Sequence, residues 1–541
     1  MTDRALMLGR SAHVDTFCRD HLPPPELWPE LVFDLAELRY PDRLNGAVEL
    51  LDSVAARLGT DRPCLLTPDG GRYSYGELLE TADRYAHVLT RDFGIVPGNR
   101  ILLRAPNNPW LVACWFAVLK AGAVAVTTMP LLRPTELTTI AEIARMDLAL
   151  CDDRFVDDLR AADLRGAPIV TSGELDDRAH AAPSGFESVD TAADDVAMLA
   201  FTSGTTGRPK ATMHFHRDLL AVADTFSQHV IRPTPDDVFT GTPPLAFTFG
   251  LGGLLLFPFR VGASVLLIEK ATPDELADAI EAGGATVCST APTAYRAMLA
   301  TGRPERLRTL RRAVSAGEHL PGSTWQAFHE ATGVRLIDGI GSTEMLHVFV
   351  SAADDDIRPG ATGRAVPGYR ARIVDDAGDP VAPGTPGRLA VRGPTGCRYL
   401  DDARQSVYVQ KGWNLTGDTF VQDDDGYFWF QARNDDMIVS SGYNIAGPEV
   451  EEALIGHGSV LECCVVGVPD AARGQLVKAF VVLREGVAGT EELVAELQDR
   501  AKQRIAPYKY PRAIEFVPSL PRTTTGKVQR YVLREHATEQ V

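Results

Sequence analysis

One short stretch combines hydroxyl groups, glycines and cations in a way that suits phosphate binding: Thr202-Ser203-Gly204-Thr205-Thr206-Gly207-Arg208-Pro209-Lys210. Glycine allows positive φ, so neighbouring N–H groups can point together toward an anion. The stretch is not the Walker A loop, because Pro209 stands where that motif has its second glycine. A polar surface turn is the alternative. The flanks favour phosphate binding, because an apolar strand-like run, 196–201, leads in and an apolar-periodic segment through Leu219 and Val222 leads out.

Four further stretches could carry chemistry, in the order Asp338-Gly339-Ile340-Gly341-Ser342-Thr343-Glu344, Leu415-Thr416-Gly417-Asp418, Gln431-Ala432-Arg433-Asn434-Asp435-Asp436-Met437-Ile438 and Pro521-Arg522-Thr523-Thr524-Thr525-Gly526-Lys527. Taken singly, each has an ordinary interpretation: a capped turn, a Gly-Asp turn, a solvated pair of aspartates, and a lysine that serves solubility. The carboxylate of Glu344 would also suit Mg²⁺, which prefers hard oxygen ligands.

Together the five stretches resemble, in wording and order, the motifs of the adenylate-forming superfamily, which comprises acyl-CoA and aryl-CoA synthetases, peptide-synthetase adenylation domains and firefly-type luciferases. The resemblance covers the whole chain. It implies activation of a carboxylic acid by ATP to an acyl-adenylate, followed by transfer to a thiol. Two positions depart from the family pattern. Ile340 stands where a tyrosine is usual, so we expect an aliphatic contact with adenine, and Ala432 replaces a glycine.

The resemblance also implies roles for individual residues. Lys527 would be catalytic, reaching the carboxylate and the α-phosphate; Thr343 would contact the α-phosphate, and Glu344 would hold Mg²⁺. Asp418 would accept hydrogen bonds from the ribose, and Arg433 would contact ribose or phosphate. The full set expected to bind the nucleotide is Thr202, Ser203, Gly204, Thr205, Thr206, Gly207, Lys210, Gly317, Glu318, Asp338, Gly339, Ile340, Asp418 and Arg433.

Thioester formation needs space that Lys527 would otherwise occupy, and the family resolves this by rotating its C-terminal domain. By resemblance, Asp435 is the hinge, and Ser441, Gly442 and Tyr443 form one wall of the tunnel for the CoA thiol. Gly442 would admit a narrow pantetheine arm. A solvated turn remains the alternative for the paired aspartates, because a hinge also lies in such turns.

The acid site is expected in residues that follow the phosphate loop and Glu344. Phe247 and Phe249 surround Thr248 and precede Gly250, and aromatic walls with glycines suit a flat ring. The run Ile-Gly-Ser-Thr-Glu-Met-Leu-His, which ends at His347, resembles the benzoate and 2-aminobenzoate–CoA ligase branch, as do residues 11–17, 27–31 and 245–253. In that branch the histidine lines the acid site; a satisfied core histidine is the alternative.

We therefore predict an aryl-acid–CoA ligase that uses ATP, Mg²⁺ and CoA on a small aromatic acid. A free-standing adenylation enzyme that loads a carrier protein shares all five motifs and is the second hypothesis. The third is a non-catalytic nucleotide-binding or scaffold protein, against which Lys527 and Glu344 speak. The motifs leave open the ring substituents, the pathway and whether the protein is a monomer or a homodimer.

The elements that must position these residues alternate between strand and helix. Strand-like 99–103, helical 109–120 and strand-like 123–126 form one unit, and 261–268, 273–282 and 285–289 repeat the pattern. This alternation predicts an α/β fold with mostly parallel sheets, which bind ligands at the carboxyl ends of strands. We expect an N-terminal domain over 1–434, with an antiparallel β subdomain from about 360 to 434, and a small, mobile α+β lid over 435–541.

Bulk properties exclude several other classes of protein. The 541 residues exceed a single-core domain, and the net charge of −18 disfavours nucleic acid or an anionic membrane as a partner. Eight scattered cysteines lack metal-binding spacing, and no signal peptide is evident, so we expect a cytoplasmic protein. Residues 243–268 carry a single charge, Arg260, but their prolines and glycines favour a loop, a buried helix and a buried strand over a membrane span.

Overall fold

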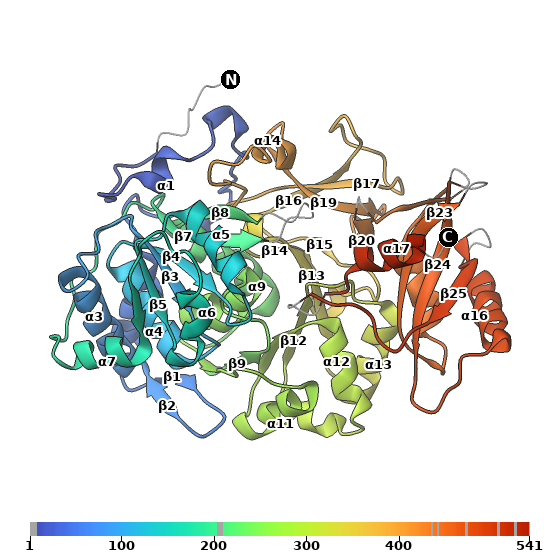
Figure 1. The fold of residues 1–541 in the computed structure, drawn as a ribbon, viewed down its shortest axis with the longest axis horizontal. Coiled ribbons are helices and arrows are strands. Elements are labelled where there is room, and N and C mark those ends of the chain that lie inside the picture. The colour runs from blue at the N-terminus through green and yellow to red at the C-terminus, as the bar shows by residue number, and fades with distance from the viewer. Residues whose placement is uncertain are drawn as a thin grey trace.

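The computed structural model describes residues 8–202, 209–433, 436–440, 443–470, 474–505, 509–523 and 527–539. Figure 1 shows two sheet-and-helix layers from the first two thirds of the chain, an antiparallel sheet above them, and a smaller C-terminal lobe at one end. Among the described residues, no helix is long and apolar enough to cross a membrane.

The first sheet has the strand order β6-β5-β3-β4-β7-β8. Its strands are β3 (Arg100–Arg104), β4 (Val124–Thr128), β5 (Leu148–Cys151), β6 (Ile169–Thr171), β7 (Val196–Thr202) and β8 (Lys210–Phe215). All pairs are parallel except β7 with β8. Its helices are α3 (Tyr75–Arg91), α4 (Pro109–Lys120), α5 (Pro134–Ala144), α6 (Val156–Arg160) and α7 (Ser172–His180). The predicted strand–helix–strand unit from 99 to 126 is confirmed as β3, α4 and β4.

The second sheet has the order β15-β14-β13-β12-β11-β9-β10-β1-β2. Its strands are β1 (Pro63–Leu66), β2 (Arg72–Ser74), β9 (Val238–Gly241), β10 (Ser264–Leu266), β11 (Val287–Thr290), β12 (Arg312–Ala316), β13 (Leu336–Gly341), β14 (Val348–Ser351) and β15 (Arg364–Ala365). Pairing is parallel from β1 to β13 and antiparallel at both edges. The helices α11 (Pro273–Gly283), α12 (Pro292–Ala300) and α13 (Gly322–Thr332) follow in the same part of the chain. Thr272 caps α11, since its hydroxyl accepts a hydrogen bond from the backbone N–H of Glu275.

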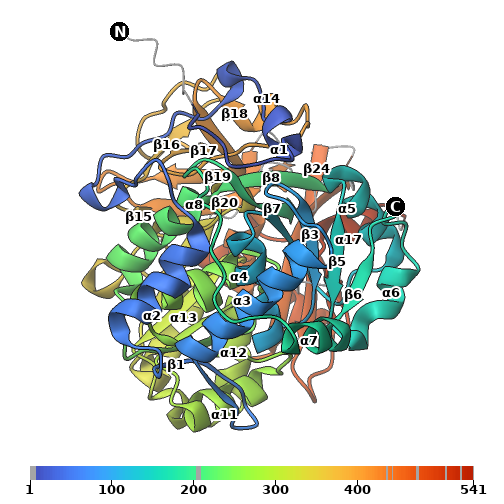
Figure 2. The ribbon, with the colours of Figure 1, turned by 90° about the vertical axis from the view of Figure 1, so that its left-hand side faces the viewer.

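Helices α3 and α4 are packed between the two sheets (Figure 2). Almost every residue of α4 is buried, as expected for a helix with apolar side chains on all sides. The ring centroids of Phe116, on α4, and Phe259 are 5.2 Å apart. Phe259 belongs to the segment 243–268, which folds as α9 (Thr248–Leu251), the π-helix η6 (Gly252–Leu256), α10 (Phe257–Val261) and β10. The prediction of a buried helix and strand for this segment is confirmed, except that α10 continues to Val261.

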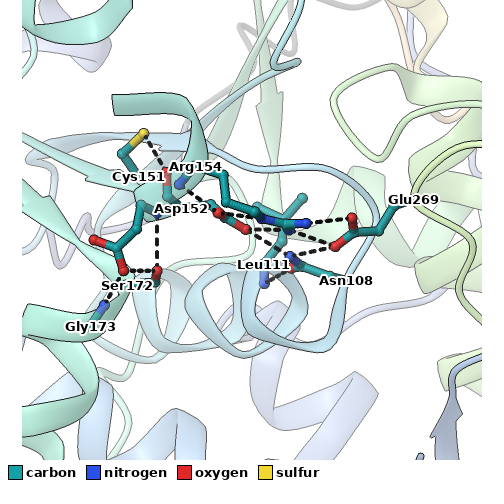
Figure 3. A network of polar contacts seen from close by, with 9 residues as sticks. Asn108, Leu111, Cys151, Asp152, Arg154, Ser172, Gly173 and Glu269 are labelled. Carbon is teal, nitrogen blue, oxygen red and sulfur yellow. Dashed lines mark hydrogen bonds and ion pairs between the residues drawn. The ribbon is translucent and has the colours of Figure 1, made fainter. Parts of the chain in front are cut away.

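A polar network also joins the two layers close to the carboxyl end of β5 (Figure 3). Arg154 donates to both carboxylate oxygens of Asp152 at 2.9 and 2.7 Å, and to both of Glu269, which follows β10, at 2.8 and 2.7 Å. Asn108, which caps α4, donates to Asp152 at 3.1 Å. Burial alone would raise the pKa of Asp152, but these donors hold that pKa below its usual value. The carboxylate is therefore charged and anchors both layers.

The third sheet is antiparallel, with β20 (Phe428–Arg433) paired to β19 and the order β16-β17-β19-β18. Its other strands are β16 (Arg370–Val374), β17 (Gly387–Arg392), β18 (Val409–Gln410) and β19 (Trp413–Gln422), and α14 (Gln405–Tyr408) precedes β18. The dense prolines and glycines after residue 360 correspond to the turns of this sheet, as the sequence predicts.

The C-terminal lobe has its own sheet and core. The strands β21 (Ile438–Ser440), β22 (Tyr443–Ile445), β23 (Val460–Asp470), β24 (Gly474–Leu483) and β25 (Ala513–Phe516) pack with α15 (Gly447–Ile455), α16 (Glu491–Arg504) and α17 (Arg530–Glu539). Thr490 caps α16, and Pro448 lies in the first turn of α15, as is common for these residue types. In Figure 1 this lobe lies beside β20, α12 and α13. The predicted domain boundary at 435 falls outside the described residues.

Candidate active site

The predicted site residues gather where β12, β13 and the β7–β8 hairpin end. In the second sheet, Ser315 pairs with Asp338 and Ala316 with Gly339, so Gly317 directly follows the strand beside the 338–344 stretch. In the first sheet, Thr202 pairs with Lys210, which places both at the mouth of the predicted phosphate loop. The antiparallel return of β8 is a finding that alternation alone does not predict. Five residues of the expected nucleotide set lie in 203–208, outside the described residues: Ser203, Gly204, Thr205, Thr206 and Gly207.

The short turn that carries Thr343 and Glu344 is held from outside at four consecutive residues. Each contact comes from a segment distant in sequence: Tyr408 Oη to Ser342 Oγ at 2.9 Å, His214 Nε2 to the Thr343 carbonyl at 2.9 Å, Tyr399 Oη to Glu344 Oε1 at 2.5 Å, and Thr395 Oγ1 to the Met345 carbonyl at 2.7 Å. The turn, η8 (Thr343–Met345), is therefore fixed by tertiary hydrogen bonds more than by its own brief helix.

His214 is fully buried on β8 and contacts this turn directly. Burial and the nearby guanidinium of Arg398 lower the pKa of His214 to about 3, so the imidazole is neutral at pH 7. Its Nε2 must then carry the proton in order to donate to the carbonyl of Thr343. The strand that leaves the phosphate loop thus positions the residue expected at the α-phosphate. Sequence reasoning missed His214, Tyr399, Tyr408 and Thr395, because their partners lie far away along the chain.

Glu344 is the expected metal ligand, and its carboxylate is buried but close to a cation. The ammonium of Lys210 lies 3.5 Å from Glu344 Oε1 and 2.6 Å from the hydroxyl of Tyr399. The described residues hold no group of three or more candidate metal ligands. Mg²⁺ bound to a nucleotide commonly takes only one or two protein carboxylates, with phosphates and water completing its shell. The single buried carboxylate of Glu344 fits that requirement.

Asp338 and the glycines after it shape the surface next to β12. Its Oδ1 atom is buried without a hydrogen-bonding partner among the described residues, and burial raises the pKa of this carboxyl. A Cβ on Gly339 would lie 2.8 Å from Val348 Cγ1, and one on Gly341 would lie 2.6 Å from the carbonyl oxygen of His347. Neither position therefore tolerates a side chain. Ile340 between them packs partly buried against the core.

The C-terminal lobe brings Lys527 to the same strand ends. A Cβ on Gly317, whose φ is +88°, would lie 4.0 Å from Cε of Lys527. Thr523 and Lys527 close their own turn through Thr523 N–H to the Lys527 carbonyl at 2.8 Å and Lys527 N–H to Thr523 Oγ1 at 3.1 Å. Glu318, expected among the nucleotide-binding residues, lies 3.8 Å from the guanidinium of Arg522. The loop that carries the lysine is thus within reach of the nucleotide region.

Asp418 and Arg433 lie opposite each other on the neighbouring strands β19 and β20. Antiparallel partners have Cβ atoms about 4.5–5.5 Å apart, so the two predicted ribose-contacting positions are adjacent. Asp435, Ser441 and Gly442 lie outside the described residues, and Tyr443 begins β22. The hinge and the thiol tunnel therefore remain predictions.

His347 lies at the centre of an aromatic cluster. Its ring centroid is 5.3 Å from that of Phe226, 5.7 Å from Phe249 and 4.6 Å from Phe257. A Cβ on Gly252 would lie 2.3 Å from the imidazole, so this glycine makes room for the ring. Two of the predicted acid-site residues, Thr248 and Gly250, are buried on α9, while Phe247 precedes that helix. Phe226 and Phe257 were not predicted, although Phe257 lies in the apolar, glycine-rich run that the sequence singles out.

The imidazole of His347 has unusual surroundings for a buried polar group. Neither ring nitrogen makes a hydrogen bond of ordinary geometry to a described residue. Burial lowers the pKa of His347 to about 3, an effect that the nearby carbonyl of Phe249 offsets only in part. The residue just before it, Leu346, has φ +69°, a strained value for a branched side chain. The neutral imidazole of His347, which can both donate and accept a hydrogen bond, therefore lies within an otherwise apolar cluster.

Comparisons with known proteins agree with this architecture. Residues 51–398 match the model of the AMP-binding enzyme family, and 449–527 match the AMP-binding enzyme C-terminal domain. The benzoate–CoA ligase of Thauera aromatica is 34% identical over 518 residues, 92% of this chain and 97% of that protein. Two solved structures are similar: an anthranilate CoA ligase in complex with anthranoyl-AMP (TM-score 0.89, 33% identity, 94% of this chain and 99% of that one) and a benzoate CoA ligase from Burkholderia xenovorans (0.84, 32%, 91% and 100%).

The layered α/β body, the antiparallel sheet and the small C-terminal lobe thus make up the fold of an adenylate-forming enzyme. The chain belongs to the AMP-binding enzyme family.

We predict that His214→Leu lowers kcat/KM for ATP by about tenfold, because an unsatisfied buried carbonyl costs about 1–3 kcal/mol and Thr343 would shift. His214→Gln, which retains an N–H donor, should recover part of the loss. His216→Leu is the matched control, since His216 is equally buried but accepts from Gly46 N–H instead. Steady-state kinetics with thermal unfolding of each variant would make the comparison. Equal losses in the two leucine variants would contradict a specific role for His214.

Proposed function

We propose that this enzyme activates an aromatic carboxylic acid with ATP and transfers the acyl group to CoA, giving the aryl-CoA thioester, AMP and pyrophosphate. The observation that carries this proposal is the meeting of two lobes at one place. Lys527 packs over Gly317, while Lys210 and Glu344 meet at the adjoining strand ends. The names of the similar proteins, benzoate and anthranilate CoA ligases, support both an aryl acid and CoA as the acceptor. They favour CoA over a carrier protein.

In the first half-reaction the substrate carboxylate attacks the α-phosphorus of ATP, and the bond to pyrophosphate breaks. Two anions must approach each other, and their repulsion in a partly dry site amounts to several kcal/mol unless cations offset it, about 4 kcal/mol per pair at 4 Å and an effective dielectric of 20. Lys527 offsets charge at the carboxylate and α-phosphate, and Lys210 with the phosphate loop holds the pyrophosphate. Thr343 orients the α-phosphate.

The remaining nucleotide contacts follow from the same strand ends. The unpartnered oxygen of Asp338 can accept from the exocyclic amine of adenine beside Ile340, and Asp418 with Arg433 can bind the ribose. Glu344 would hold Mg²⁺, which supplies positive charge to the phosphate oxygens when bound.

In the second half-reaction the CoA thiol attacks the carbonyl of the aryl adenylate, the carbon–oxygen bond to AMP breaks, and the thiol proton is released. Lys527 occupies the approach that the thiol needs. We propose that the C-terminal lobe turns about Asp435, so that Ser441, Gly442 and Tyr443 line the entry of the pantetheine arm. The eight cysteines of the chain are all unpaired and buried, which supports a reducing, cytoplasmic site of action.

For the aromatic acid itself we propose 2-aminobenzoate. An unsubstituted benzoate ring has no group that could pair with the imidazole of His347, whereas an ortho amine can donate to it. Phe226, Phe249 and Phe257 supply apolar contacts to a flat ring. Thr248 is a second hydrogen-bonding group in this region. A site built around a hydrogen bond discriminates strongly against an analogue that cannot make it.

The proposed function is tested by acid-dependent pyrophosphate release over a panel of 2-aminobenzoate, benzoate and salicylate, with CoA present and absent. We expect release with at least one of these acids, and aryl-CoA product when CoA is present. Transfer to a carrier-protein phosphopantetheine but not to CoA would favour the second hypothesis. No release with any acid would contradict an enzymatic role.

We predict that Lys527→Ala slows adenylation by roughly 10²–10³-fold, by analogy with the loss of one charge-stabilising donor. Single-turnover formation of the adenylate measures this step. The rate at which separately prepared aryl adenylate reacts with CoA should change much less, because Lys527 has left the site in that step. A loss of less than tenfold in adenylation would remove Lys527 from this role.

We predict that His347→Phe lowers kcat/KM for 2-aminobenzoate about tenfold more than for benzoate, because one hydrogen bond to the amine is lost. Phe226→Leu is the control, since it removes apolar contact and should affect both acids alike. A wild-type enzyme with a tenfold preference for benzoate would overturn the proposed amine contact.

A further inference from the structure

A tyrosine that the motifs do not include lies between the two charged groups at the base of the phosphate loop. The hydroxyl of Tyr399 is 2.6 Å from the ammonium of Lys210 and 2.5 Å from Oε1 of Glu344. The ammonium and the carboxylate oxygen are 3.5 Å apart, farther than either is from the hydroxyl. Tyr399 and Glu344 are buried, and the side chain of Lys210 is 16% exposed.

The position of Tyr399 is fixed by backbone hydrogen bonds to the strand that carries Lys210. Residue 399 forms an antiparallel bridge with Thr212 of β8. On either side, Met213 N–H donates to the Arg398 carbonyl at 2.8 Å, and Leu400 N–H donates to the Ala211 carbonyl at 2.9 Å. The backbone of Tyr399 is therefore held in a fixed register beside the strand that begins at Lys210.

The chemistry of a phenol suits a place between an ammonium and a carboxylate. A tyrosine hydroxyl has one proton to donate and lone pairs that accept. Here the proton goes to Glu344, and a lone pair accepts from Lys210. The ammonium also lies 4.5 Å from the centroid of the Tyr399 ring, a cation–π distance. The hydroxyl thus makes the shorter contact with each charged group, while the ammonium and the carboxylate form a longer ion pair at 3.5 Å.

We propose that Tyr399 is a positioning residue that separates Lys210 from Glu344, so that the ammonium serves as counter-ion of the carboxylate before nucleotide binding and is released to the phosphates when a magnesium nucleotide arrives. The proposal rests on the proposed function, in which Glu344 is the carboxylate that meets the metal. Lys210 and Mg²⁺ are then successive cations on one buried acid. Tyr399 then determines how readily Mg²⁺ replaces the ammonium of Lys210 beside Glu344.

Two substitutions should shift the magnesium requirement in opposite directions. Without the hydroxyl, in Tyr399→Phe, the ion pair between Lys210 and Glu344 can shorten from 3.5 Å, and the incoming metal must break this closer pair. Without the ammonium, in Lys210→Met, the carboxylate has no competing cation and should take the metal more readily, even though ATP itself binds more weakly. If the role of Tyr399 were purely structural, the two substitutions would not shift the magnesium requirement in opposite directions.

The chain offers a matched control for the tyrosine. Tyr408 lies beside Tyr399, with ring centroids 5.9 Å apart at 70°, and its hydroxyl contacts Ser342 Oγ instead of Glu344. Tyr408→Phe removes a hydroxyl that contacts the same turn, and it leaves Lys210 and Glu344 unchanged. It should leave the magnesium requirement unchanged, whatever it does to turnover.

The test is calorimetric titration of ATP at a series of Mg²⁺ concentrations, without acid or CoA, supported by the shift in unfolding temperature with ATP plus Mg²⁺ against ATP plus EDTA. We expect Tyr399→Phe to raise the half-saturating Mg²⁺ concentration by about tenfold, the size of one hydrogen bond to a charged group. Lys210→Met should lower it. In the double variant the effect of Tyr399→Phe should largely disappear, because its partner is gone.

Three outcomes would overturn the proposal: an unchanged Mg²⁺ requirement in Tyr399→Phe, an equal rise in Tyr408→Phe, or full additivity in the double variant. If Tyr399→Phe does not fold, the sign of the change in Lys210→Met decides, and a rise contradicts the proposal. Failure of the proposed function is distinguishable, because it would appear in the wild-type protein as no acid-dependent release of pyrophosphate.

Discussion

The structure is organised around one electrostatic problem, the approach of a carboxylate to a polyphosphate within a protein of net charge −18. The general field of such a protein repels both reactants. The cations that offset this must therefore be local and close. Lys210 comes from the first sheet and Lys527 from the C-terminal lobe, and the two lobes meet at Gly317. On the proposed function, the place of Lys527 on a separate lobe would allow it to leave once the adenylate has formed.

The site also shows how a short turn can be made rigid. The turn 342–345 lies between a strand and its antiparallel neighbour, and its own helix is too brief to hold it. Hydrogen bonds from β8 and from the 395–408 segment reach four residues in succession. Because β8 also carries Lys210, a displacement of the phosphate loop would move β8 and so shift Thr343 and Glu344. The residues proposed to bind the pyrophosphate and the α-phosphate are thus connected through β8.

Much of the fold could be predicted from local sequence. Strand–helix alternation, the capping threonines 272 and 490, and the short strands after 360 all express propensities that act over a few residues. The antiparallel pairing of β8 with β7 could not be predicted, because the residue pattern of a strand does not specify its direction in the sheet. Nor could Tyr399, His214 and Phe226, whose contacts join segments far apart in the chain. The five motifs identify the residues proposed to contact the ligands, whereas the residues that support them have no comparable local signature.

Among the buried polar atoms that lack a hydrogen-bonding partner in the described part of the chain, those of Asp338 and His347 lie where a ligand is expected. Asp338 Oδ1 and the ring nitrogens of His347 lose the hydrogen bonds they would make in water, which costs each group about 1–3 kcal/mol in the unliganded protein. The buried charges of Arg398 and Asp218 are paired with each other, although Arg398 Nε and Nη1 and Asp218 Oδ1 have no hydrogen-bonding partner among the described residues. A ligand that satisfies the orphaned groups recovers that free energy, and one that cannot leaves the cost in place. On the proposed function, these unsatisfied groups would favour ligands that can hydrogen-bond to them, adenine at Asp338 and a substituted aromatic acid at His347.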